Sequence, residues 1–136
     1  MLWVNAPNAG FTTPEAKPWL PLPADKATEN AATQHQRPRS MLNLYRRLLA
    51  LRRSEPALHL GEISDVRAEK TLLRYCRRGP GGEDGFQVLL NLGSEPAVTR
   101  SPRGRVVLTT MLDGEGAPVD GEVTVEGGEG LLIALE

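Results

Sequence analysis

The hydrophobic pattern of this chain changes from a helical period to a strand period near residue 60. Between Ser40 and Leu58 apolar residues recur three or four positions apart, which predicts one amphipathic helix over residues 40–54. Ser40 precedes the first turn as a capping residue, and Pro56 ends the helix near Ser54. Such a one-sided helix must pack its apolar stripe on another body. The stripe consists of Met41, Leu44, Tyr45, Leu48 and Leu51, widened by Leu42 and Leu49.

Beyond residue 60 apolar and polar residues alternate in short runs that turn residues separate. Six or seven short strands with regularly spaced turn signals predict an antiparallel sandwich or a barrel-like sheet, and the lack of intervening helices disfavours a parallel sheet. The expected strands are Glu62–Arg67, Thr71–Arg77, Phe86–Leu92, Ala97–Arg100, Arg105–Met111, Gly121–Val125 and Leu131–Leu135. Their expected core positions include Leu72, Tyr75, Val88, Leu90, Val106, Leu108, Leu132 and Ala134.

Residues 1–39 show neither period and contain Pro7, Pro14, Pro18, Pro21, Pro23 and Pro38. Prolines at this density favour extended and turn geometry. The segment also carries Trp3, Phe11 and Trp19, which are too apolar for an ordinary flexible linker. The predicted fold class is therefore α+β and mainly β: an extended proline-rich lead-in, one amphipathic helix and an antiparallel β-sandwich.

Composition narrows the function classes. The 136 residues include 16 basic and 17 acidic side chains, a balance that disfavours a nucleic-acid partner. Cys76 is the single cysteine and cannot form an internal disulfide. No apolar run approaches the roughly 20 residues that span a bilayer, and no signal peptide opens the sequence, so we expect a cytoplasmic protein without a membrane partner. Scarce aromatic residues disfavour a sugar-binding module.

The candidate chemistry is sparse. His35 and His59 lack a second His or a Cys at metal-ligand spacing, and Cys76 has no base nearby in sequence, so packing is the favoured role of that thiol. The loop Gly79–Gly85 lacks the Lys-Ser/Thr pair of a phosphate-binding loop, and Asp113–Asp120 lacks the spacing of a calcium loop. We therefore assign no catalytic, cofactor-binding or metal-binding residue and expect no cofactor.

Three motifs in series resemble a known family. They are MLWVNAPNAGF at Met1–Phe11, KPWLPLP at Lys17–Pro23 and the helix LNLYRRLLALRRSEPAL at Leu42–Leu58. Their content and order are similar to the C-terminal end of the α-glucosidase branch of the α-amylase superfamily, glycoside hydrolase family 13, which includes oligo-1,6-glucosidase and trehalose synthase-like enzymes. Leu73-Arg74-Tyr75 and Val88–Leu92 resemble strands of that family more loosely.

The resemblance implies a domain division and a partner. Residues 1–60 would be the end of a catalytic (β/α)8 barrel, with residues 40–54 as its last helix, and residues 61–136 would form the C-terminal β-sandwich domain. The partner would be the missing barrel of an enzyme that hydrolyses, or transfers, α-linked glucosides with retention. In the family the catalytic Asp, Glu and His-Asp pair precede the first motif, so no catalytic residue is carried over and we expect this chain to be inactive alone.

Two features of the sequence depart from the family's pattern, and one alternative function stays open. Leu2 and Val4 flank Trp3 where the family usually has Gln and Asp, so an inherited substrate contact there is in doubt. Met1 falls in register with an internal Met of the family, which suggests a truncated reading frame, a gene remnant or an engineered cut. Exposed apolar surface would favour self-association. The alternative function is a stand-alone β-module that binds a protein or carbohydrate partner.

Overall fold

The computed structural model describes residues 1–82 and 85–136. The chain divides into two compact units, Met1–Arg47 and Leu48–Glu136, and the division falls inside helix α2 (Met41–Ser54). The domain boundary near residue 60 that the family resemblance implies stays a prediction.

The first unit contains two short helical segments that the hydrophobic period does not indicate, the 3-10 helix η1 (Pro7–Gly10) and α1 (Ala31–Gln36). Neither has a buried apolar stripe; in α1 no residue is buried at all. α1 instead depends on its cap, because the Asn30 side-chain oxygen accepts a hydrogen bond from the Thr33 N–H at 2.9 Å. The hydrophobic period of the sequence therefore gives no indication of these two helical segments.

Helix α2 begins and ends where the sequence predicts. The backbone N–H of Asn43 donates to Ser40 Oγ at 3.3 Å, and that of Leu42 donates to Gln34 Oε1 at 3.0 Å. These bonds satisfy donors that have no partner within the helix. After Ser54 the chain forms a further short helix, α3 (Pro56–His59), with Pro56 in its first turn, where its missing N–H has no cost.

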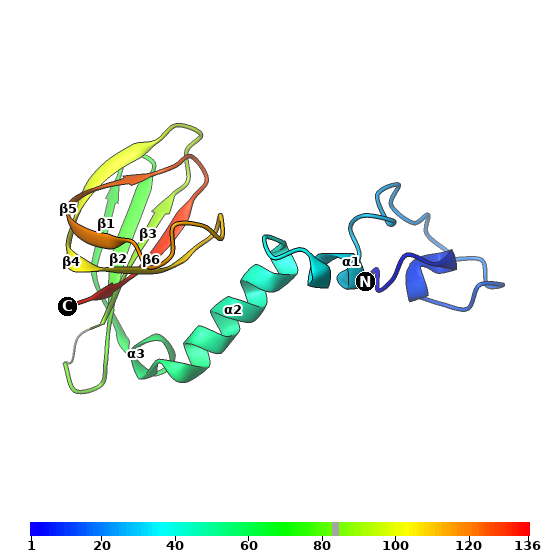
Figure 1. Cartoon of the computed structure of the whole chain (residues 1–136), viewed down its shortest axis with the longest axis horizontal. Coiled ribbons are helices and arrows are strands. Elements are labelled where there is room, and N and C mark those ends of the chain that lie inside the picture. Colours follow the sequence, from blue (N-terminus) through cyan, green and yellow to red (C-terminus); the bar gives the residue numbers. More distant parts are fainter. Residues whose placement is uncertain (83–84) are drawn as a thin grey trace. The chain divides into compact units, whose positions relative to one another are not determined.

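The second unit is built on one six-stranded antiparallel sheet, in the order β1-β2-β3-β6-β4-β5 (Figure 1). The last strand of the chain lies between β3 and β4, and every strand pair is antiparallel, which confirms the predicted mainly β fold. The strands are β1 (Glu62–Glu69), β2 (Leu72–Arg78), β3 (Phe86–Asn91), β4 (Ala97–Thr109), β5 (Pro118–Val125) and β6 (Gly130–Leu135).

Strand β4 corrects one detail of the sequence prediction. The expected strands at 97–100 and 105–111 form one continuous strand, with an irregularity between Ser101 and Gly104. Pro102 lies in this irregular stretch, where its missing N–H interrupts no regular pairing. At Gly104 the backbones of β4 and β6 approach so closely that a Cβ would lie 2.2 Å from the carbonyl oxygen of Ala134. Pro and Gly here mark a bulge, whereas the sequence pattern indicates a turn.

The sealed core lies on one face of the sheet. It consists of Leu72, Leu89, Val106, Val119, Val125, Leu131 and Ile133. A buried amide closes one end of this core, because the Asn91 side chain at the end of β3 donates to the carbonyl oxygen of Val125 at the end of β5, at 3.1 Å.

The core positions expected from the sequence are divided between the two faces of the sheet. Leu72 and Val106 belong to the sealed core. The other expected positions lie on the opposite face; they are Tyr75, Val88, Leu90, Leu108, Leu132 and Ala134. Strands β3 and β6 read FQVLLN and GLLIAL, so both of their faces are apolar and alternation alone does not identify the inner one.

Among the described residues, no helix combines the length and the apolar character needed to cross a membrane.

Candidate functional site

The residues that the sequence singles out for possible chemistry are dispersed in the structure. His35 lies in α1, and its Nδ1 is hydrogen-bonded by the Arg46 guanidinium of α2. His59 is the last residue of α3, in the second unit, and Cys76 is buried in β2. Within residues 1–82 and 85–136, no group of three or more His, Cys, Asp or Glu side chains is arranged to hold a metal ion.

The Cys76 thiol lies in a polar row on the core side of the sheet. It pairs with Ser64 of β1 on one side and Gln87 of β3 on the other. Burial, together with the carboxylate of Asp65, raises the pKa of this thiol above its ordinary value, while Arg78 and Arg74 oppose the shift. A thiol that keeps its proton is a weak nucleophile, so its surroundings suit packing rather than covalent catalysis.

The two candidate loops are turns between strands. In the loop after β2, the N–H of Gly82 bonds the carbonyl of Gly79, and Glu83 and Asp84 lie outside the described residues. In the loop after β4, Leu112, Gly114 and Gly116 have left-handed backbone angles. The second loop also closes on β4, because the N–H of Gly116 donates to the carbonyl of Val106 at 2.8 Å. Both arrangements fit turn formation.

The motif around Asn8 has a specific backbone geometry. Asn8, Ala9 and Gly10 have φ values of 55°, 51° and 69°, so three successive residues adopt the left-handed region. The Asn8 amide supports this turn by donating to the carbonyl oxygens of Thr13 at 2.6 Å and Ala16 at 2.8 Å. The Ala9 carbonyl accepts from the Trp3 N–H at 2.9 Å. These contacts give a physical reason for the residue order Asn-Ala-Gly.

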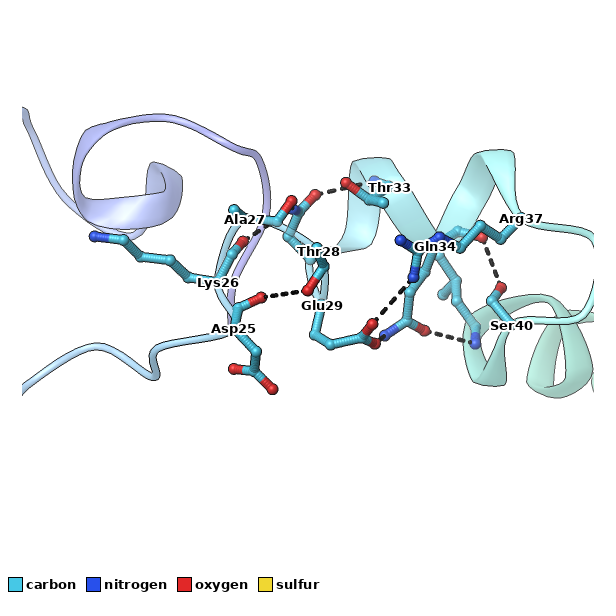
Figure 2. A network of polar contacts seen from close by, with 11 residues as sticks. Asp25, Lys26, Ala27, Thr28, Glu29, Thr33, Gln34, Arg37 and Ser40 are labelled. Carbon is cyan, nitrogen blue, oxygen red and sulfur yellow. Dashed lines mark hydrogen bonds and ion pairs between the residues drawn. The ribbon is translucent and has the colours of Figure 1, made fainter.

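A second polar network joins the lead-in to α1 and α2 (Figure 2). The buried Asn30 amide donates to the carbonyl oxygens of Lys26 and Ala27 at 3.0 and 3.1 Å. Ser40 Oγ donates to the Gln34 carbonyl at 2.6 Å, and Arg37 forms an ion pair with Glu29 at 3.1 Å. These side chains bond to one another and to the backbone. The network therefore has a structural role in ordering the segment rather than a catalytic one.

The most distinctive feature of the first unit is exposed apolar surface. Trp19 is 86% exposed, Trp3 51% and Phe11 56%, and on α2 Met41 is 61% and Tyr45 59% exposed. An apolar hollow of about 380 Å³ lies in the same unit; Leu2, Ala31, Met41, Leu42 and Tyr45 are among its lining residues. Of the predicted helical stripe, Leu44 is buried, while Met41, Tyr45 and Leu48 are exposed. The candidate functional site of this chain is therefore this exposed apolar surface.

The two lead-in positions that depart from the family's motif, Leu2 and Val4, belong to the same part of the chain. Leu2 and Val4 stand where the resemblance leads us to expect polar residues, and Leu2 lines the apolar hollow. The backbone here is tied to α1, since the carbonyls of Leu2 and Trp3 accept from the N–H groups of Ala31 and Ala32 at 3.0 and 2.9 Å. No sugar-binding polar group is contributed by the Leu2 or Val4 side chain.

Comparison with known proteins gives consistent matches. Residues 1–61 match the family described as "Alpha amylase, catalytic domain". A probable alpha-glucosidase of Rhizobium meliloti (strain 1021) is 38% identical over 78% of this chain, and the amino acid transporter heavy chain SLC3A1 of Mus musculus is 33% identical over 98% of it. The chain spans 18% and 21% of the length of these two proteins.

Solved structures agree over almost the whole chain. The isomaltulose synthase of Klebsiella sp. LX3 is 26% identical and superposes with a TM-score of 0.85 over 99% of this chain and 24% of its own. A glucose-bound mutant of the isomaltulose synthase of Erwinia rhapontici NX5 is 25% identical, with a TM-score of 0.83 over the same shares. The lead-in, the helices and the sheet therefore occur together in these larger proteins.

Proposed function

Because this chain belongs to the α-amylase family (glycoside hydrolase family 13), as a C-terminal segment of the family's fold, we propose that it is part of an α-glucosidase-like enzyme. The complete enzyme would hydrolyse, or transfer, α-linked glucosides with retention. Residues 1–61 would complete the catalytic barrel, and residues 62–136 would support it. The rest of that barrel is the proposed partner of this chain.

One observation carries the proposal: the large exposed apolar side chains of the first unit lie within the residues that match the catalytic domain. Trp3, Trp19, Met41 and Tyr45 are all more than half exposed. Met41 and Tyr45 line one hollow together with Leu2 and Leu42, and apolar surface gathered in this way marks an interaction site. A family barrel is the body that such a helix would cover, and burial of an aromatic side chain of this size stabilises an interface by about 2 kcal/mol.

The proposed division of roles follows from the chemistry. Retaining glycosidases need two carboxyl groups about 5 Å apart on a rigid frame, one as nucleophile and one as acid and base. The residues that the family resemblance associates with this chemistry have no counterpart among the 136 residues. This chain would therefore contribute to stability and to the position of the barrel's end, and the reacting groups would come from the remainder of the enzyme.

A chimera tests the proposal. Residues 1–136 replace the matching segment of the Rhizobium meliloti probable alpha-glucosidase, and hydrolysis of an aryl α-glucoside is measured for the chimera, its parent and the isolated chain. We expect turnover by the chimera and none above a buffer blank by the isolated chain. A chimera that folds like its parent yet is inactive contradicts the proposal, as does turnover by the repurified isolated chain.

A second candidate is supported by the match to SLC3A1, which extends over 98% of this chain. That protein is named as an amino acid transporter heavy chain, so the same segment also occurs in a protein that belongs to an assembly. Under this alternative the exposed surface supports a protein-binding body.

A further inference from the structure

The last turn of α2 carries two arginines that have no bonding partner within residues 1–82 and 85–136. The helix reads MLNLYRRLLALRRS, with two adjacent arginine pairs and no acidic residue. Arg52 and Arg53, the second pair, are exposed, and neither side chain forms a hydrogen bond or an ion pair with a described residue. The carbonyl end of a helix favours cations, which explains why the charge is tolerated there. The hydrogen-bond donors of both guanidinium groups nevertheless remain available to a ligand.

Both arginines line one hollow together with His59. The hollow has a volume of about 290 Å³, and Leu49 also lines it. All four residues belong to the second compact unit, so the hollow lies within one body. His59 is the last residue of α3, and its exposed imidazole likewise has no partner in the described part of the chain. Two guanidinium groups and an imidazole, from the ends of two successive helices, thus line the same space.

The acidic residue closest in sequence does not belong to this hollow. Glu55, between α2 and α3, is half-buried and lines a separate hollow with Pro56 and Phe86. The next acidic residues along the chain are Glu29 before it and Glu62 after it. The hollow at the end of α2 therefore combines positive charge with hydrogen-bond donors and has no carboxylate among its lining residues. This combination attracts an anion.

The donor set favours a phosphate group over a carboxylate. A carboxylate presents two oxygens in one plane and is satisfied by a single bidentate guanidinium, whereas a phosphate presents three or more acceptor oxygens in different directions. Two guanidinium groups and an imidazole offer more donors than one carboxylate accepts. The volume of about 290 Å³ is close to the lower limit of small-molecule pockets, and Leu49 provides an apolar wall for the carbon atoms of a phosphate ester.

We propose that Arg52, Arg53 and His59 form a binding site for a phosphate group, carried either by inorganic phosphate or by a small phosphate monoester. The arginines bind the phosphate oxygens through charge-assisted hydrogen bonds, and the imidazole donates a further one. The site adjoins α3, which Arg77 of β2 holds by hydrogen bonds to two of its carbonyl groups, both at 3.3 Å. A bound phosphate would therefore stabilise the connection between the helices and the β-domain. This inference goes beyond the proposed function and does not depend on it.

Titration of the whole chain with inorganic phosphate tests the site. The ionic strength is held constant with sodium chloride, and NMR follows the side-chain N–H signals of the arginines and the ring signals of His59. We expect saturable shifts with a Kd of about 1 mM, the level that a few charge-assisted hydrogen bonds provide. Arg52→Gln/Arg53→Gln should weaken binding by about tenfold or more. Arg67→Gln is the matched control and should keep the wild-type Kd, because Arg67 is an exposed arginine of β1 outside the hollow.

Folding and ligand chemistry are checked on the same proteins. Gln has nearly the helix propensity of Arg, and circular dichroism melts establish that each variant is folded; Arg52→Gln alone replaces the double variant if that variant does not fold. Glucose 6-phosphate and sodium acetate are titrated in parallel. Tighter binding of glucose 6-phosphate than of inorganic phosphate identifies an ester as the ligand, and equal or weaker binding identifies inorganic phosphate.

Two results would overturn the site. If acetate binds as tightly as phosphate, the hollow does not select a phosphate group, and a carboxylate of another chain becomes the better occupant. If the shifts do not saturate, or if Arg67→Gln weakens binding as much as the arginine-pair variant does, the response reflects general screening of surface charge. Neither result affects the proposed function, which the chimera tests separately.

Discussion

At the scale of single residues, buried amides organise the parts of this chain that hydrophobic packing does not. Asn30 caps α1 and bonds two carbonyls of the lead-in. Asn91 has the same role in the sheet: its Nδ2 donates to the carbonyls of Glu95, Val125 and Glu126, and its Oδ1 accepts from the Gly93 N–H. Each amide satisfies several backbone groups that would otherwise be buried without partners.

Replacing Asn91 with alanine should destabilise the β-domain strongly. The substitution removes the partners of three carbonyls and one N–H at a side chain that is 1% exposed. We expect a loss of about 3 kcal/mol in the free energy of unfolding, because unpaired buried polar groups retain their desolvation cost. Urea denaturation followed by circular dichroism measures it, with the exposed Asn5→Ala as control. A loss no greater than that of the control contradicts this role.

The roles of these residues are only partly predictable from sequence. Ser40 is recognisable as a cap because it directly precedes a strongly periodic helix. Asn30 bonds groups within four residues of itself, but no apolar period follows it to mark a cap. Asn91 carries no local signal, because the fold brings the carbonyl of Val125 to it from far away in sequence. The left-handed turn at Asn8–Gly10 shows its residue types in the sequence, but its three successive positive φ values do not follow from them.

At the scale of elements, predictability follows the strength of the apolar period. α2 has a stripe over its whole length, and the sequence predicts it within a residue of its observed bounds. η1, α1 and α3 are too short for a period and depend on proline positions and side-chain caps. The antiparallel sheet is predictable, but the pattern divides β4 at Pro102 and Gly104, since those residue types are also common in turns.

The close contact of β4 with β6 gives a test at this scale. Gly104→Ala would place a Cβ 2.2 Å from the Ala134 carbonyl oxygen, so the strands must separate or the bulge must shift. We expect a destabilisation of about 2 kcal/mol, in the range of other overpacked sites. The exposed Thr124→Ala on β5 serves as control, and chemical denaturation compares the two. Equal stability of both variants would show that the bulge absorbs a side chain freely.

At the scale of the whole molecule, the chain combines an ordered β-domain core with a first unit whose apolar side chains remain exposed. The family is predictable from sequence because three motifs occur in series. The exposed apolar surface is predictable only in part. The period identifies the stripe of α2, but Leu44 is buried, so a charge placed there would disturb packing as well as the surface. Met41 and Tyr45, at 61% and 59% exposure, are the better positions for a surface test.

The central claim is that residues 1–61 present a surface made for a larger body, and sedimentation velocity of the isolated chain over a wide range of concentrations tests it most directly. We expect the wild-type chain to associate as its concentration rises, because exposed apolar surface is buried between copies when the barrel is absent. Met41→Glu/Tyr45→Glu should suppress the association while leaving the melting of the β-domain unchanged. A wild-type chain that stays monomeric at the highest concentration, with residues 1–39 resistant to protease, would contradict the account and favour a stand-alone module.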